Sequence, residues 1–177
     1  MKDSEQASYI SEYLLKRGLN KKQVLALLAN IAVESGYTFN PEVKQKGRKD
    51  PAIGLFQFDP RDKGLLKVYE QYKTDLKKPE SLETQLDFMV DSLNGSYKKG
   101  TEHIGYGNVK KFNAASNDNK VTSSGLTEMF ATDILRPGKP HLDRRLKAAV
   151  DLYPMVYGEK TKEEQAAQAR TFPEAMQ

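Results

Sequence analysis

Apolar residues recur at three- and four-residue intervals along most of the chain, which is the spacing of amphipathic helices. A first helix is predicted over residues 3–17 and is ended by Gly18. Residues 20–23, Asn-Lys-Lys-Gln, form a capping-box sequence that predicts the start of a second helix, which Gly36 ends. The apolar stripe of this second helix consists of Val24, Leu27, Leu28 and Ile31.

The same periodicity predicts further helices after a polar loop at residues 37–52. They are expected near residues 65–72, 81–94, 109–115, 124–135 and 141–153. The short apolar run 53–58 is expected to be a strand or extended segment, and the glycine-rich stretch 95–107 is expected to be a loop. The predicted fold class is therefore mainly α (α+β), with one small β element near residues 50–60. We expect one domain over residues 1–157 and a polar tail over residues 158–177.

Composition supports a soluble globular protein, because 38% of the 177 residues are hydrophobic and 29% are charged. No apolar run is long enough to span a bilayer, so no membrane insertion is expected. The N-terminal residues lack the apolar segment of a secretory signal, and we expect synthesis in a cytoplasm and delivery by another device. Cysteine is absent, which excludes disulfides and thiolate metal sites.

The formal net charge of +4 is compatible with an anionic polymer as partner, either cell wall or nucleic acid. The basic residues alternate with acidic ones and form no nucleic-acid motif, so we expect no nucleic-acid partner. His103 and His141 are isolated and lack metal-ligand spacing, and no glycine-rich phosphate loop is present. We therefore predict no metal and no cofactor.

The residue with the most distinctive chemical context is Glu34, at the end of the predicted second helix. A helix C-terminus carries partial negative charge, which disfavours a carboxylate there. Apolar neighbours disfavour the charged form further and raise the carboxyl pKa. A carboxylic acid that stays protonated near neutral pH can protonate the leaving oxygen of a glycoside. The alternative interpretation is an exposed glutamate at the edge of a helix.

Four segments together resemble the phage tail lysozyme family within the lysozyme-like superfamily. Residues 25–36 (LALLANIAVESG) resemble the helix of the family's catalytic glutamate, and residues 53–58 (IGLFQF) resemble its glycine–apolar–glutamine segment. Residues 136–149 (RPGKPHLDRRLKAA) resemble its C-terminal connector and helix, and residues 85–89 (QLDFM) resemble its middle helix. The family pattern often has a tryptophan after the glutamine, where this chain has Phe58.

The resemblance implies a lysozyme-like fold and a muramidase that cleaves peptidoglycan between N-acetylmuramic acid and N-acetylglucosamine. It also implies a phage context, either a virion-associated lysozyme or an endolysin that acts at the bacterial cell wall. Peptidoglycan is then the partner, with other phage tail or virion proteins as further candidates. Glu34 is the expected general acid.

Asp59 and Asp62 follow the glutamine segment and are candidates for the second carboxylate, although aspartates beside proline or lysine are also ordinary turn formers. Gln57 is a candidate to bind the acetamido or hydroxyl groups of the sugar, with a strand residue that only satisfies backbone groups as the alternative. Phe58 and Tyr106 are candidates to stack on a sugar face. Tyr106 is also a candidate to hydrogen-bond Glu34, with packing as the alternative to both roles.

Ser35 is a candidate to position Glu34, although a serine before a helix-ending glycine is also simple capping chemistry. If neither aspartate reaches the site, a lytic transglycosylase on the same fold becomes the stronger hypothesis. Two other classes stay open: a wall-binding or structural module without catalysis, and a DNA-binding helical protein with salt-dependent affinity.

Overall fold

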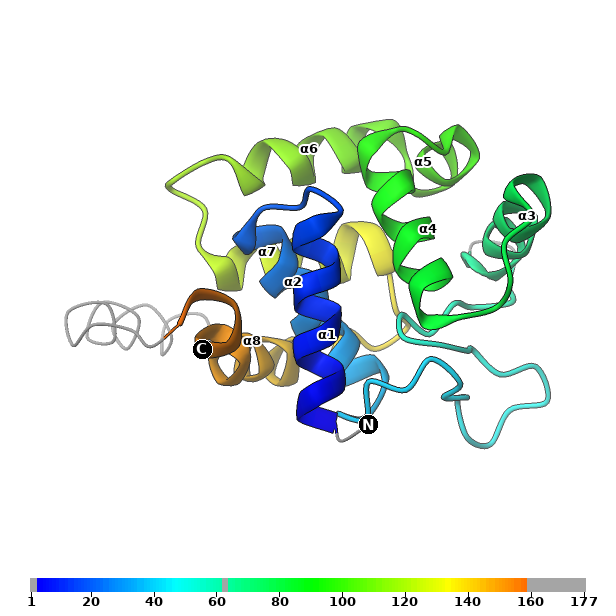
Figure 1. The fold of residues 1–177 in the computed structure, drawn as a ribbon, viewed down its shortest axis with the longest axis horizontal. Coiled ribbons are helices and arrows are strands. Elements are labelled where there is room, and N and C mark those ends of the chain that lie inside the picture. The colour runs from blue at the N-terminus through cyan, green and yellow to red at the C-terminus, as the bar shows by residue number, and fades with distance from the viewer. Residues whose placement is uncertain (1–2, 62–63, 159–177) are drawn as a thin grey trace.

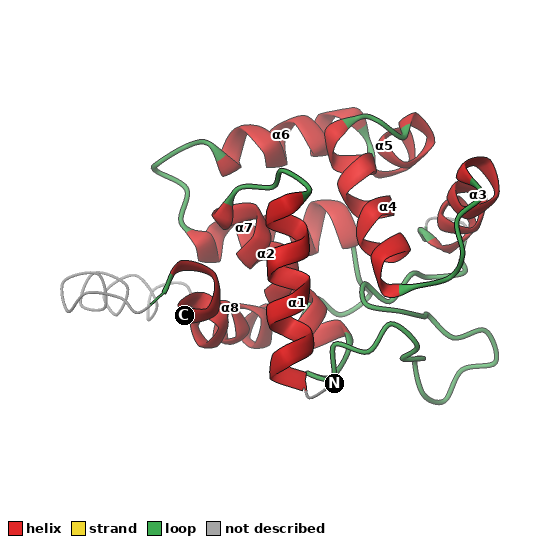
Figure 2. Ribbon diagram, viewed as in Figure 1, coloured by secondary structure: helices red, strands yellow, loops and turns green. Residues whose placement is uncertain are grey.

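The computed structural model describes residues 3–61 and 64–158, and every regular element in these residues is a helix (Figures 1 and 2). The elements are α1 (Asp3–Lys16), α2 (Lys21–Glu34), α3 (Leu66–Leu76), α4 (Leu82–Asn94), α5 (Lys98–Ile104), α6 (Tyr106–Ser116), α7 (Ser123–Met129), the π-helix η1 (Phe130–Leu135) and α8 (Leu142–Tyr157). The expected tail lies almost wholly outside the described residues.

Helix α2 lies at the centre of one group of helices. It packs against α1, α7, α8 and η1, and its residues 23–32 are all buried. The predicted capping box is present: the Gln23 backbone N–H donates to Asn20 Oδ1, and the Asn20 N–H donates to Gln23 Oε1, both at 2.9 Å. Because its partners surround it, α2 holds its C-terminal residue, Glu34, in a fixed place.

A second group of helices consists of α3, α4 and α5, which surround a cluster of aromatic rings. Phe58, Tyr69 and Phe88 lie at its centre, with ring centroids 4.7 Å apart for Phe58–Tyr69 and 5.5 Å for Phe58–Phe88. The two groups meet where α1 faces α4. There Arg17 bridges Asp87 (2.9 Å) and Asp91 (2.7 Å), which joins residues about seventy positions apart in the sequence.

The predicted β element is only partly present, because the described residues contain isolated bridges and no strand (Figure 2). Ile53 pairs with both Lys44 and Phe58. Between Ile53 and Phe58 the backbone turns back on itself, with positive φ at Gly54 (+83°) and Gln57 (+50°). The four residues between Ile53 and Phe58 form the turn itself, so this segment has no further residues to pair as a strand.

The expected loop at residues 95–107 is wrong, since this stretch contains α5 and the start of α6. Two glycines of this stretch serve helix packing and a break between helices, and neither marks a loop. A Cβ on Gly100 would come within 2.9 Å of the Ser92 Cβ, so this glycine allows α5 to approach α4 closely. Gly105 has φ +108° and forms the break between α5 and α6.

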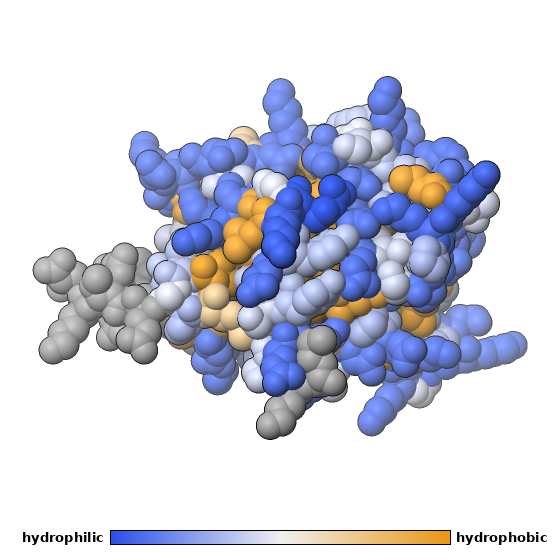
Figure 3. Space-filling view, in the orientation of Figure 1, coloured by the Kyte–Doolittle hydropathy of each residue, from blue (hydrophilic) through white to orange (hydrophobic). Residues whose placement is uncertain are grey.

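The surface in Figure 3 is mostly hydrophilic, and its hydrophobic residues form small, separate groups. Within residues 3–61 and 64–158, no helix combines the length and the apolar character needed to cross a bilayer.

Candidate active site

Glu34 forms an ion pair with a buried arginine of α8, Arg145. Arg145 Nη2 lies 2.6 Å from Glu34 Oε1, and the side chains of Arg145 and Glu34 are 2% and 14% exposed, respectively. The contact joins the C-terminal end of α2 to the first turns of α8, the two helices that pack together most extensively. The candidate acid is therefore mostly buried and ion-paired, with a small part of its side chain open to solvent.

Two further hydrogen bonds hold Arg145 in place. Its Nη1 donates to Asn30 Oδ1 at 2.7 Å, and its Nε donates to the Pro140 carbonyl. The Asn30 amide nitrogen donates to the carbonyls of Ala26 (2.8 Å) and Thr127 (3.1 Å), which leaves its oxygen facing the guanidinium. Glu34 thus rests against a side chain whose orientation is set by Asn30 of α2, which α7 holds in turn, and by the Pro140 carbonyl before α8.

Burial is the main influence on Glu34 and raises its carboxyl pKa above the ordinary value for glutamate. The charge and hydrogen bond of Arg145 and, more weakly, the charge of His141 oppose this rise. Among the described residues, no carboxylate contributes to the shift. The result is a carboxyl group that holds its proton more tightly than a surface glutamate does.

Ser35 shapes the chain as it leaves α2. Its hydroxyl accepts a hydrogen bond from the Phe39 backbone N–H at 2.9 Å, and its carbonyl accepts one from Thr38 Oγ1 at 2.8 Å. In the described part of the chain, no hydrogen bond joins Ser35 to the Glu34 side chain. Ser35 therefore fixes the backbone after Glu34, and its hydroxyl is engaged with the Phe39 backbone N–H.

Gln57 lies at a turn position with positive φ and bonds to the loop through its amide nitrogen. Its Nε2 donates to the carbonyls of Gly54 (2.9 Å) and Val43 (3.3 Å), while its Oε1 accepts no hydrogen bond from any described residue. The buried Gln85 of α4 anchors this turn. Gln85 Oε1 accepts from the Leu55 N–H at 2.8 Å, and its Nε2 donates to the Pro41 carbonyl at 2.9 Å.

Asp59 pairs with its near neighbour Arg61, and Asp62 lies outside the described residues. The Asp59 carboxylate accepts from the Arg61 guanidinium and from the Arg61 backbone N–H (2.8 Å), and Arg48 lies 4.0 Å away. The hydrogen bonds from Arg61 are the main reason that the Asp59 pKa lies below its usual range. Asp59 is therefore ionised at neutral pH and engaged within its own turn.

The two aromatic candidates differ sharply in exposure. Phe58 is 1% exposed and is part of the aromatic core, so its ring has no face open to solvent in this structure. Tyr106 is 57% exposed, and it is the first residue of α6 and not a loop residue. Of the two, Tyr106 alone presents an accessible ring.

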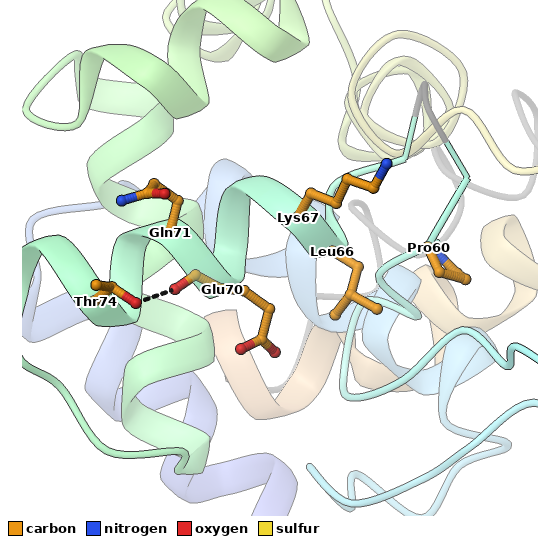
Figure 4. A pocket seen from close by; sticks show the side chains of 6 residues that line it. All are labelled: Pro60, Leu66, Lys67, Glu70, Gln71 and Thr74. Atoms are coloured by element: carbon orange, nitrogen blue, oxygen red, sulfur yellow. Dashed lines mark hydrogen bonds between the residues drawn. The ribbon is translucent and has the colours of Figure 1, made fainter.

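A shallow hollow lies on α3 and the segment before it (Figure 4). Its lining consists of Pro60, Leu66, Lys67, Glu70, Gln71 and Thr74. Glu70 is its one carboxylate and is ion-paired with Lys73 at 3.1 Å. No residue of α2 or α8 lines the hollow, and it offers no pair of acids for glycoside chemistry. Among the described residues, no three histidine or acidic side chains gather as metal ligands would.

Sequence reasoning missed the two residues that anchor the candidate groups: Arg145, which contacts Glu34, and Gln85, which holds the turn that carries Gln57. Each is a polar side chain on the buried face of an amphipathic helix. Arg145 directly precedes the core residue Leu146, and Gln85 precedes Leu86. Because buried polar groups need partners, a polar residue at such a position was the available signal.

A protein-family model described as phage tail lysozyme matches residues 5–156. This span includes both Glu34 and Arg145 and the turn around Gln57. No curated protein sequence matches the chain.

Proposed function

The chain belongs to the phage tail lysozyme family, and we propose that it cleaves the β-1,4 bond between N-acetylmuramic acid and N-acetylglucosamine, with Glu34 as general acid. Membership of this family implies an enzyme that degrades peptidoglycan and is a glycoside hydrolase.

One observation supports Glu34 more than any other: it is a mostly buried glutamate whose pKa is raised by that burial. A general acid must hold a proton at working pH and release it to the leaving oxygen as the glycosidic bond breaks. A wall-binding module without catalysis would fit an exposed Glu34 with ordinary titration, which is not the arrangement described above.

The second catalytic group is proposed to be Asp59 or Asp62. Asp59 is ionised, as a base or an electrostatic stabiliser must be, but both of its oxygens accept hydrogen bonds from Arg61. To act on water, Asp59 would have to exchange part of that pairing for the substrate or for the water. This engagement favours one alternative, a lytic transglycosylase, in which the hydroxymethyl oxygen of the sugar replaces water and no second carboxylate is required.

Substrate contacts are proposed for two groups with available polar or aromatic surface. Gln57 Oε1 would accept a hydrogen bond from an acetamido N–H or a hydroxyl, since its amide nitrogen already holds the turn. Tyr106 would stack on a sugar ring at the exposed start of α6. Ser35 would act through the backbone that follows Glu34.

The setting that we propose is bacteriophage infection, with the enzyme either carried in the virion tail or released as an endolysin. Its substrate is the bacterial cell wall, and other tail or virion proteins are its candidate partners. Nucleic acid is not among the proposed partners.

The test is digestion of purified peptidoglycan by the wild type and by Glu34→Gln, with released muropeptides identified by mass spectrometry. Glu42→Gln is the matched control, because Glu42 is an exposed glutamate eight residues away. We expect products with reducing N-acetylmuramic ends from the wild type and Glu42→Gln, and at least about 100-fold less from Glu34→Gln.

Anhydro-muramic products would replace the hydrolase by the transglycosylase. Full activity of Glu34→Gln would refute the assignment of the acid. The absence of products from every variant on several wall types would favour the binding module.

A further inference from the structure

We propose that Arg145 is the positioning residue of the catalytic acid: it fixes one oxygen of Glu34 and leaves the other to face the glycosidic oxygen. This inference rests on the proposed role of Glu34. It starts from the asymmetry of the carboxyl group, whose Oε1 accepts a 2.6 Å hydrogen bond from Arg145, while Oε2 accepts none from any described residue.

The orientation of Arg145 is determined by groups other than Glu34. Three of its nitrogens have separate acceptors on Pro140, Asn30 and Glu34, and its side chain is almost fully buried. A guanidinium can satisfy three acceptors at once because its donors form a rigid planar fork. Lysine carries the same charge but cannot reproduce this arrangement.

The contact with Arg145 orients the acid before proton transfer and stabilises the carboxylate after it. Before it, the proton resides on Oε2 and passes to the leaving oxygen while the bond between that oxygen and the sugar carbon breaks. After it, Glu34 is a carboxylate at a partly buried helix C-terminus, where the adjacent Arg145 charge stabilises it. Arg145 therefore keeps the acid strong enough to release its proton in a site whose burial favours retention.

Few other charges act on Glu34. From α8 and the residue before it, the groups that do so are Arg145 and His141. No charged group on α1, α7 or η1, the other elements packed on α2, contributes in the described part of the chain. His141 is exposed and makes no hydrogen bond to Glu34 among the described residues, so Arg145 is the dominant charge.

The experiment compares Arg145→Gln, Arg145→Lys and Arg144→Gln in the full chain. Arg144→Gln is the matched control, because it removes the same charge from an exposed position one residue away. Two properties are measured for each protein: peptidoglycan cleavage between about pH 4 and 9, and the Glu34 titration by carboxyl carbon-13 NMR, assigned by difference with Glu34→Gln.

For Arg145→Gln we expect the Glu34 pKa, and with it the alkaline limb of the pH profile, to move up by about 1 to 3 pH units. Arg145→Lys keeps the charge, so the limb stays near the wild-type position, but the maximal rate falls about 10- to 100-fold because the carboxyl group is misplaced. Arg144→Gln leaves both properties close to those of the wild type.

An unchanged Glu34 titration in Arg145→Gln, or an unchanged maximal rate in Arg145→Lys, overturns the inference. A purely structural role for Arg145 would lower the folded fraction and leave the pH profile of the remaining activity in place. If Arg145→Gln does not fold, the rate of Arg145→Lys decides. Failure of the proposed function is a separate result, since it shows as full activity of Glu34→Gln, whatever Arg145 does to the Glu34 titration.

Discussion

Replacing Gly54 by alanine should destabilise the protein for two reasons: the backbone there has a positive φ, and the new Cβ would collide with the Gln85 side chain. Gly54 begins the turn between the paired residues Ile53 and Phe58, with φ +83°. A Cβ at this position would lie 2.9 Å from Gln85 Cδ and 3.1 Å from its Nε2. Both distances are too short, so the buried Gln85 side chain must move.

The expected cost has two parts. An L-residue in left-handed backbone costs about 1–2 kcal/mol. Displacing Gln85 breaks its bond from the Leu55 N–H (2.8 Å) or its bond to the Pro41 carbonyl (2.9 Å), and a buried polar group without a partner costs roughly 1–3 kcal/mol. The free energy of unfolding should thus fall by about 2–5 kcal/mol in total.

Gly95→Ala separates the two parts. Gly95 follows α4 and has nearly the same φ, +81°, but no described atom lies within 4 Å of the point that its Cβ would occupy. Urea unfolding of both variants should show Gly54→Ala to be less stable than Gly95→Ala by roughly 1–3 kcal/mol. Adding Gln85→Ala to Gly54→Ala should cost less than Gln85→Ala alone, because the collision is then relieved. Equal stability of the two glycine variants would refute the reasoning.

Three further predictions concern pH and packing. Peptidoglycan cleavage should decline as pH rises through the raised pKa of Glu34, because the acid form is lost; a flat profile to pH 9 would count against Glu34 as general acid. Burial acts to raise the pKa of Asp87, but hydrogen bonds from Lys78 and Tyr13 together with nearby charges outweigh it and lower this pKa. The stability that Asp87 contributes is therefore present above pH about 4 and is lost as the pH falls through the folded-state pKa. Acid unfolding of Asp87→Asn should accordingly begin from a lower stability at neutral pH and show a shallower decline than the wild type. Phe58→Ala should cost about 3–5 kcal/mol in thermal or urea unfolding, whereas a residue that only stacks on substrate would lose activity at unchanged stability.

Local signals in the sequence were sufficient to predict most helices. The capping box at Asn20 and the serine cap at Ser81 mark true helix starts, and Gly95 marks a true end in left-handed conformation. These signals act within one turn of the residues that they organise, so they can be interpreted without knowledge of the fold. The position of Glu34 at the end of an apolar helix follows from the same short-range pattern.

What sequence reasoning missed depends on contacts between distant residues. Gly100 suggested a loop, but its small size serves the packing of α5 on Ser92 of α4. Phe58 resembled a cleft aromatic, yet the turn at Gln57 directs it into the core beside Tyr69. In each case local composition was compatible with two environments, and tertiary packing selected between them.

Two unrelated polar anchors hold two separate groups of candidate residues, which explains why these groups were predictable to different degrees. In one group, α2 and α8 form a buried pair in which Arg145 meets Glu34 across 111 positions of sequence. In the other, Gln85 of α4 ties down the turn that carries Gln57. Both anchors are single polar side chains set among apolar neighbours, where a lost partner is costly. The burial that raises the Glu34 pKa therefore comes with a buried guanidinium that opposes this rise and, as proposed above, positions the carboxyl group.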